Sequence, residues 1–352
     1  MLLALTGLIS ACGQEAVAPV PTAGTPERLS EWHLVMREGS RLVLNGQSLQ
    51  YDLNTPLFTD YAQKLRTVWL PEGTTASVTD DGVIEFPVGT VITKTFYYPQ
   101  RDGVLVAAAP RRGVVPDLDA VRLIETRLLV RRAGGWEALP YVWDEKGEDA
   151  RLSMAGDIQR VTLDHDGEVT GFSYVVPTQA ECSSCHAWDH SSGEMRPIGP
   201  KLRHVSNIDE WVAAGILPPV ERGDVRQTTD WPPDPTTSVE AVARSYLDIN
   251  CGHCHSPIGP ADTSGLFLHF DETSLRRLGA CKQPVAAGRG SGGRLVSIAP
   301  GSPEDSIMHF RMQSTDPGEM MPEIGRSLVH EEGVAVIDAW IRSMRGECVA
   351  AI

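Results

Sequence analysis

Two five-residue motifs hold the side chains best suited to chemistry in this sequence. Residues 182–186 read Cys-Ser-Ser-Cys-His, and residues 251–255 read Cys-Gly-His-Cys-His. Both match Cys-x-x-Cys-His, the signature for covalent attachment of c-type haem. The spacing suits this chemistry because two thiols one short turn apart can reach the two vinyl groups of a haem, while the adjacent imidazole comes under the iron. We therefore predict two haem c groups. Their covalent attachment residues are Cys182, Cys185, Cys251 and Cys254, and their proximal iron ligands are His186 and His255.

Two other uses of paired cysteines fit the sequence less well. A dithiol redox pair usually accompanies a β-α-β pattern, which this sequence does not show. A zinc ribbon needs its cysteine pairs about 15 to 20 residues apart, and these pairs are separated by far more. Haem attachment is therefore the preferred interpretation.

A methionine is available as the second axial ligand of the second haem. Residues 319–322 read Glu-Met-Met-Pro and lie between two predicted helices, just before the last one. This position resembles that of the Met-Pro in class I cytochromes c whose thioether binds iron, and the resemblance implies Met321 as the ligand, with Met320 as the second choice. Core filling by this methionine pair is the alternative.

The first haem has no equivalent methionine. None occurs between Arg203 and Asn250, and Met195 is poorly placed because it lies in the loop that follows the motif. His190, His204 or a residue from another part of the chain could serve, or this iron could stay open or weakly ligated.

The first residues predict export and a lipid anchor. An apolar run from Met1 ends in Ile-Ser-Ala-Cys at 9–12, which resembles the lipobox of a bacterial lipoprotein signal in which Cys12 is lipidated. No Lys or Arg precedes the run, and a frayed strand is the alternative. We expect residues 1–28 to be this signal and a flexible tether. The protein would then be anchored in the bacterial envelope, facing the periplasm or the cell surface.

Seven cysteines divide without remainder under this hypothesis. One takes lipid and four take haem, which leaves Cys281 and Cys348. Export makes a disulfide between them chemically permissible. Two buried free thiols are the alternative.

The composition favours protein partners over nucleic acid. Forty-six acidic and 31 basic side chains give a formal net charge of -15. This charge argues against a nucleic-acid partner and permits docking to a basic surface on a redox protein. The other explanation is that the negative charge serves only to keep the protein soluble.

Residues 29–176 show the pattern of strands. The runs 91–98 and 124–130 alternate and are rich in β-branched and aromatic residues. Four Asp-Gly or Gly-Gly pairs suit hairpin turns, at 81–82, 102–103, 134–135 and 166–167. We therefore predict an N-terminal antiparallel all-β domain of the sandwich or barrel type.

After Pro177 the periodicity becomes helical. Thr237 and Glu240 form a capping box ahead of an apolar face that runs into Cys251, and a last helix is expected over 329–344. We predict a multidomain chain whose second half is mainly α-helical. Residues 177–235 would form an abbreviated haem unit with a Pro-rich linker, and 236–352 a second cytochrome c-like domain.

A glycine-rich loop at 288–294 lacks the residues and the context of a phosphate-binding loop. Arg289 or Arg294 in this loop could contact haem propionates, because guanidinium groups pair well with carboxylates. An ordinary flexible loop is the alternative.

The sequence around both motifs is similar to the class I cytochrome c family. Residues 198–202 read Ile-Gly-Pro-Lys-Leu, similar to the family's Gly-Pro-x-Leu segment, and Gly259-Pro260 follows the second motif. The resemblance implies that the carbonyl of Pro200 orients the proximal imidazole and that Leu202 packs on the porphyrin.

Nearly the whole chain resembles a family of bacterial di-haem c-type cytochrome lipoproteins. The lipobox, the end of the strand region at 174–177, both motifs and the segments 284–288 and 317–322 carry this resemblance. It implies haem binding and electron transfer without naming a substrate.

We therefore expect an electron carrier rather than a catalyst, working with redox protein partners. The alternatives are a di-haem peroxidase-type enzyme or ligand sensor that uses the first haem, and a β domain that recruits a partner with the haems as accessories.

Overall fold

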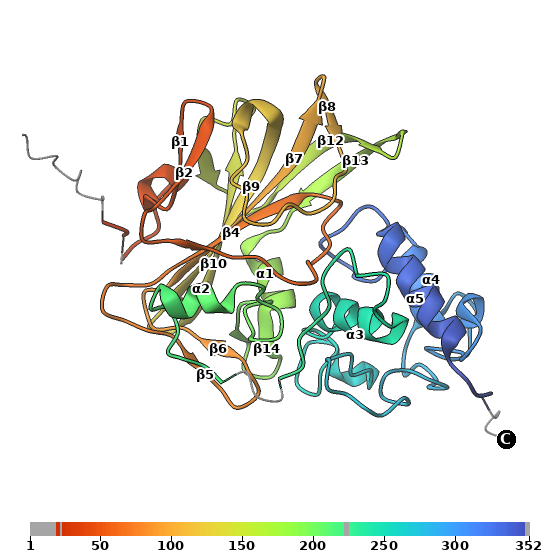
Figure 1. The fold of residues 1–352 in the computed structure, drawn as a ribbon. Coiled ribbons are helices and arrows are strands. Elements are labelled where there is room, and N and C mark those ends of the chain that lie inside the picture. The colour runs from red at the N-terminus through yellow and green to blue at the C-terminus, as the bar shows by residue number, and fades with distance from the viewer. Residues whose placement is uncertain (1–18, 22, 222–224, 349–352) are drawn as a thin grey trace, which may run out of the picture.

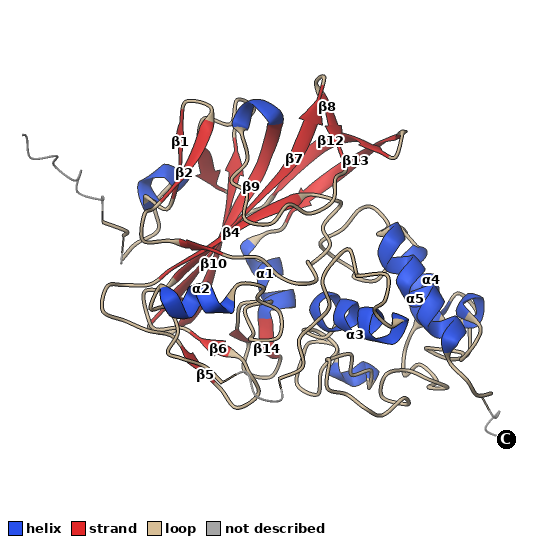
Figure 2. Cartoon of the chain, in the orientation of Figure 1, coloured by secondary structure: helices blue, strands red, loops and turns tan. Residues whose placement is uncertain are grey.

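The protein is mostly β-structure. The structure, a computed structural model, describes residues 19–21, 23–221 and 225–348. Strands account for 29% of it and helices for 19%. The largest element is a nine-stranded sheet that curls into a half-barrel, with short helices and long loops beside it (Figure 1, Figure 2).

The sheet has the strand order β11-β10-β9-β7-β8-β12-β13, and β4 pairs with both β7 and β3. All of its pairings are antiparallel except that of β8 with β12. The strands of this sheet are β3 (Leu49–Gln50), β4 (Gln63–Trp69), β7 (Val91–Arg101), β8 (Val104–Val106), β9 (Val121–Arg132), β10 (Gly135–Trp143), β11 (Ala150–Leu152), β12 (Asp157–His165) and β13 (Glu168–Val176). Three two-stranded ribbons complete the β-structure: β1 (Val35–Glu38) with β2 (Arg41–Leu44), β5 (Ser77–Val78) with β6 (Ile84–Glu85), and β14 (Ala187–Asp189) with β15 (Glu194–Met195).

The predicted hairpin turns are confirmed. Each of the four pairs connects two consecutive antiparallel strands. Asp102 and Gly103 take φ values of 51° and 80°, and Asp166 and Gly167 take 52° and 89°. These left-handed conformations match the twist of the flanking strands, which is why Asp-Gly is favoured there.

The helices are short and lie towards the C-terminal half. They are α1 (Gln179–His186), α2 (Ile208–Ala213), α3 (Val239–Asn250), α4 (Ile307–Gln313) and α5 (Glu331–Ser343). Short 3-10 turns occur at Leu29–Trp32, Leu118–Ala120, Asp262–Ser264, Gly288–Ser291 and Pro303–Asp305. Helices α3 and α5 pack together through an apolar cluster that includes Leu247, Ile337 and Trp340.

The predicted fold class is wrong. The chain forms a curled half-barrel with few helices, instead of a sandwich or barrel followed by mainly α-helical cytochrome c-like units. The helical signals after Pro177 are real but short, because glycines with positive φ and prolines interrupt them. Between α3 and α4, for example, Gly265, Gly279 and Gly301 all have positive φ, a conformation that ends a helix.

The start of α3 differs from the prediction by one residue, and that of α5 by two. Ser238 caps α3 by accepting a hydrogen bond from the backbone of Ala241, in place of the predicted capping box of Thr237 and Glu240. The local sequence pattern therefore predicts the helix but not its first residue.

Cys281 and Cys348 form a disulfide, with their Cα atoms 5.1 Å apart. Cys12 and the predicted lipobox lie outside the described residues. In the described part of the chain, no helix has the length and apolar character needed to cross a membrane.

Candidate haem site

The two motifs line one cavity, which lies between the sheet and the C-terminal helices. Its volume is about 420 Å³, within the range of ligand and cofactor sites. Strands β4, β7, β9 and β10 contribute to it, together with α1, α3 and α4. The motif residues on its surface are Cys182, Cys185, His186, Cys251, His253 and His255.

A short capped helix presents the first motif. Helix α1 begins with a capping box, in which Thr178 Oγ1 accepts from the backbone N–H of Glu181 at 3.1 Å and Glu181 Oε2 accepts from that of Thr178 at 2.8 Å. The helix packs against β10 and ends at His186. Cys182 and Cys185 are thus held one turn apart beside the sheet.

The second motif is the turn that ends α3. The backbone N–H groups of Cys254 and His255 both donate to the carbonyl of Cys251, at 3.1 and 2.9 Å. Gly259 is required just beyond, because a Cβ there would collide with the backbone carbonyl of Cys254. The turn therefore brings Cys251, His253 and His255 to the cavity that the first motif also lines.

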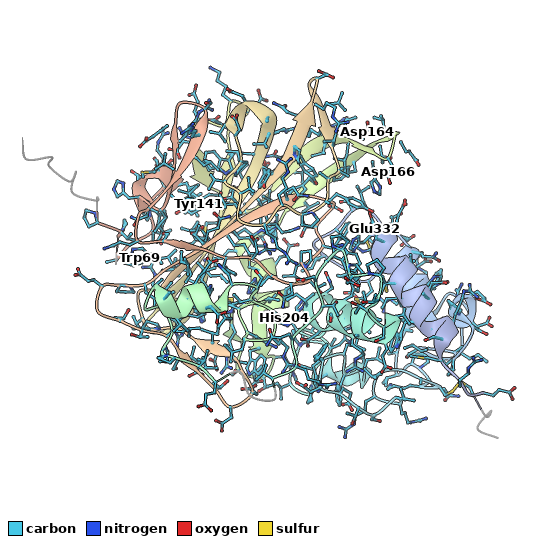
Figure 3. The ribbon with its side chains drawn as sticks, in the orientation of Figure 1. Trp69, Tyr141, Asp164, Asp166, His204 and Glu332 are labelled. Atoms are coloured by element: carbon cyan, nitrogen blue, oxygen red, sulfur yellow. A yellow bond between two sulfur atoms is a disulfide. The ribbon has the colours of Figure 1, made fainter. Side chains whose placement is uncertain are left out.

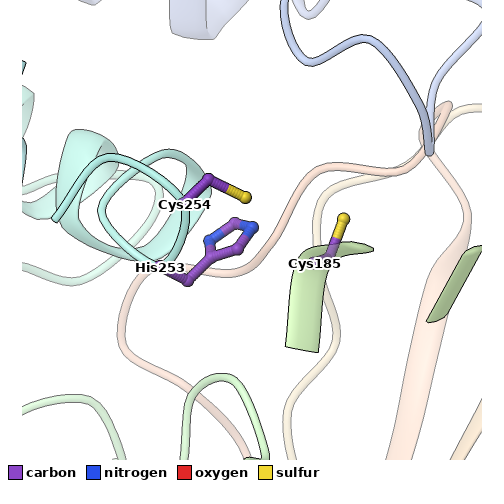
Figure 4. Close-up of side chains that lie close together, drawn as sticks. All are labelled: Cys185, His253 and Cys254. Atoms are coloured by element: carbon purple, nitrogen blue, oxygen red, sulfur yellow. The ribbon is translucent and has the colours of Figure 1, made fainter. Parts of the chain in front are cut away.

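The motifs face each other across the cavity. The ligand atoms of Cys185, His253 and Cys254 all lie within 4.8 Å of one another (Figure 4). Cys185 comes from α1, whereas the other two come from the turn after α3. Two segments far apart in sequence thus bring their attachment thiols together.

The last histidine of each motif uses Nδ1 within the protein. Nδ1 of His186 lies 2.8 Å from the backbone carbonyl of Arg196, and Nδ1 of His255 lies 3.1 Å from Oγ of Ser264. Among the described residues, neither Nε2 atom has a hydrogen-bond partner. A ring held in this way offers Nε2 as the ligand atom.

The partners implied by the resemblance to class I cytochromes are wrong. The carbonyl that contacts His186 belongs to Arg196 rather than to Pro200. Leu202, expected on the porphyrin, is buried in a separate apolar cluster and does not line the cavity. The chain thus orients its imidazoles with contacts of its own, as its different fold requires.

Burial keeps both proximal imidazoles neutral. It lowers the pKa of His186 and that of His255 to about 4, so near pH 7 both rings are in the neutral form that binds iron. Burial also raises the pKa of Cys251 to about 12. The hydrogen bond between the facing thiols lowers the pKa of Cys185 and raises that of Cys254.

Met321 lines the cavity, whereas Met320 is buried and does not. Two further methionines on the cavity surface, Met308 and Met312, escaped the sequence analysis. Their spacing of four residues on α4 is the signal that places both on one helix face. The cavity therefore holds three thioethers, of which Met321 was the predicted one.

The histidines considered for the first haem lie elsewhere. His190 contacts the carbonyl of Ile258 near the surface, and His204 is buried with Nε2 2.8 Å from Oδ2 of Asp248 (Figure 3). Neither lines the cavity, nor does Met195. His253 and His330 do line it, and only the folded chain could show this.

Arg289 and Arg294 also lie away from the cavity. Arg289 is exposed and pairs with Asp316 at 2.8 Å, and Arg294 donates to the carbonyl of Glu304 at 2.7 Å. The cations on the cavity surface are Arg66, Lys94 and Arg127 from the sheet, and Arg311 and Arg326 from the C-terminal segment.

The residues present fit two covalently held haems. The cavity surface offers the thiols of Cys182, Cys185 and Cys251 and several thioether sulfurs, and the fourth motif thiol, that of Cys254, lies beside Cys185. The two neutral imidazoles have no hydrogen-bond partner at Nε2 among the described residues. Much of its remaining surface is apolar, including Leu247, Leu266 and Val285. Apolar walls with a few well-placed polar groups are typical of cofactor sites.

Comparison of the chain with protein-family models, with curated proteins and with solved structures found no match. Its function must therefore be argued from the residues of the cavity.

Proposed function

We propose that this protein is an exported di-haem c-type cytochrome that transfers electrons through two covalently bound haems. The observation that supports this best is the meeting of the two Cys-x-x-Cys-His motifs on one cavity. A motif that matches by chance would not be expected to find its second copy within a few ångströms. The half-barrel fold would make this a haem protein outside the class I cytochrome architecture.

Each haem would supply one-electron chemistry by cycling between Fe(II) and Fe(III). The chain's own residues would attach the haems and ligate their irons. The thiols would add across the vinyl groups to form thioethers, and His186 and His255 would hold the irons through Nε2. Because the motifs are adjacent, electrons would pass between the two haems without leaving the cavity.

Export and a lipid anchor at Cys12 belong to the same proposal. A haem c protein is matured outside the cytoplasm, where a disulfide such as Cys281–Cys348 also persists. The acidic net charge of -15 suits docking to a basic surface on a redox partner.

Optical spectra of the purified protein in both redox states test the proposal. The parent should show two c-type haems that are reduced and reoxidised reversibly. The double variant Cys182→Ser/Cys185→Ser and the double variant Cys251→Ser/Cys254→Ser should each lose about half of the haem absorbance. Full haem content in either variant would contradict the assignment of its motif.

Carbon monoxide separates a carrier from a catalyst or sensor in the same experiment. Two six-coordinate haems that resist carbon monoxide indicate electron transfer. Rapid binding at one haem would instead indicate catalysis or sensing at that iron, as in the peroxidase-type alternative.

One observation favours a second candidate, a metal site without haem. Cys185, His253 and Cys254 alone supply three ligand atoms within 4.8 Å of one another, and two thiolates with an imidazole suit Zn²⁺. Under this candidate the exported protein would contain stoichiometric zinc and no covalent haem. Metal analysis of the purified protein distinguishes the two.

A further inference from the structure

Three positively charged side chains stand side by side across the sheet. In the register of β4, β7 and β9, Lys94 is paired with Arg66 on one side and with Arg127 on the other. All three line the cavity. Directly opposed residues have Cβ atoms about 4.5 to 5.5 Å apart, and like charges there are destabilising. This cation row therefore favours an anion beside it.

The chain neutralises only part of the row. Arg127 is paired with buried Glu125 through two hydrogen bonds, of 2.7 and 2.6 Å. Arg66 is 5% exposed, its closest acid is Asp52 at 3.7 Å, and its Nη2 atom is buried without a partner. Its guanidinium is thus only partly satisfied.

Of the three cations in the row, Lys94 has the fewest polar partners. Across the described residues it has no hydrogen bond and no ion pair, and its ammonium lies over the ring of Phe96, 5.0 Å from the centroid. Burial and the neighbouring cations lower its pKa well below the usual value. A partly buried ammonium with no carboxylate partner is costly, so Lys94 is the member of the row that an anion would stabilise most.

Other charged groups on the cavity surface are already engaged. Arg326 donates to four backbone carbonyls, and Arg311 donates to the carbonyls of Glu319 and Met320. The acid on α1, Glu181, caps its own helix. The surplus positive charge is therefore concentrated at the cation row.

We infer that the row of Arg66, Lys94 and Arg127 binds the ionised propionate carboxylates of the haem carried by the first motif. This inference rests on the proposed function. The first motif is the nearer one, because α1 packs against β10, which is the neighbour of β9 in the sheet. Guanidinium and ammonium groups form strong charge-assisted hydrogen bonds with carboxylates. The sheet would then be part of the haem site and would set the potential of that haem.

Replacing Lys94 tests this inference in the haem-loaded protein. Positive charge beside a haem stabilises the reduced, less positive iron. In Lys94→Met the midpoint potential of one haem should therefore fall, while that of the other haem changes less. The potentials are measured by optical redox titration at about pH 6, where carboxylates remain ionised and Lys94, with its lowered pKa, is more protonated than at higher pH.

Three variants provide the comparison. Lys94→Arg keeps the charge and should keep the parent potential. Lys94→Gln is a second neutral variant that keeps a polar group, in case Lys94→Met does not fold. Lys146→Met removes the same charge from an exposed turn and should leave both potentials unchanged.

The outcomes separate the two proposals. If two haems are attached and neither potential falls in the neutral Lys94 variants, the propionate assignment is wrong and the proposed function stands. If Lys146→Met lowers a potential as much as Lys94→Met, the effect is one of net charge and the assignment is also wrong. If the parent carries no covalent haem, both proposals fall.

Discussion

The cavity contains more thioether sulfurs than the proposed second haem iron would need. Met308, Met312 and Met321 all line it, but they differ in how they are held. Met308 and Met312 pack against the apolar cluster of α3 and α5. Met321 is fixed through its backbone, since its N–H donates to the carbonyl of Arg311 at 2.9 Å and its own carbonyl accepts from Arg326 at 3.1 Å.

We expect Met321→Ala to abolish the near-infrared charge-transfer band of the oxidised protein, which reports methionine bound to iron. The potential of that haem should fall, because a methionine ligand raises it. The measurement is a near-infrared spectrum together with a redox titration.

Met308→Leu and Met312→Leu are the matched controls, because each removes a cavity sulfur while nearly conserving volume. Both should retain the band. If the band is lost in either control and retained in Met321→Ala, the iron ligand is a methionine of α4 and the assignment of Met321 is wrong.

At the residue scale, the motifs could be located from the sequence, but the hydrogen-bond partners of their histidines could not be predicted. Cys-x-x-Cys-His is local, so its thiols and imidazole are identified by spacing alone. The acceptor on Arg196 and the hydroxyl of Ser264 depend on how loops fold back over each motif. The cation row depends on the register of three strands, which no local pattern specifies.

At the scale of elements, the loop between α4 and α5 is organised by one buried side chain. Arg326 is 8% exposed and donates to the carbonyls of Arg311, Ser314 and Met321 at 3.1, 2.8 and 3.1 Å. It thereby ties the end of α4 to the segment that carries the predicted methionine ligand.

We expect Arg326→Met to lower the free energy of unfolding by about 1 to 3 kcal/mol, because four carbonyls, including that of Leu328, lose a charged donor. The charge-transfer band should weaken at the same time, because the methionine is no longer held. Chemical denaturation and the near-infrared spectrum are the measurements.

Arg289→Met is the control for this prediction. Arg289 is exposed and forms a surface ion pair with Asp316, so its loss should change stability by less than about 1 kcal/mol. Equal effects of the two substitutions would show that Arg326 does not organise the loop.

Elements with strong local signals were predictable. The hairpin turns and the last helix, α5 (Glu331–Ser343), follow from Asp-Gly pairs and an apolar stripe. The first residues of helices were harder to predict, as the cap at Ser238 shows. Several alternative caps lie within one or two residues, and tertiary packing selects among them.

At the scale of the whole molecule, the curvature of the sheet and the position of the C-terminal segment escaped prediction. A sandwich, a barrel and a half-barrel share the same alternating strands and differ in long-range closure. The parallel pairing of β8 with β12 joins residues about sixty positions apart and is also a long-range feature that no local pattern predicts. The meeting of two motifs on one cavity is likewise a property of the complete fold.

The mass of the denatured full-length protein, exported by a host that matures c-type cytochromes, tests the central claim most directly. The expected mass is that of the chain, with any lipid, plus two covalently attached haems. The Cys182→Ser/Cys185→Ser variant should carry only one. A mass without added haem, together with stoichiometric zinc in the native protein, would contradict the account and identify the facing cysteines and His253 as a metal site.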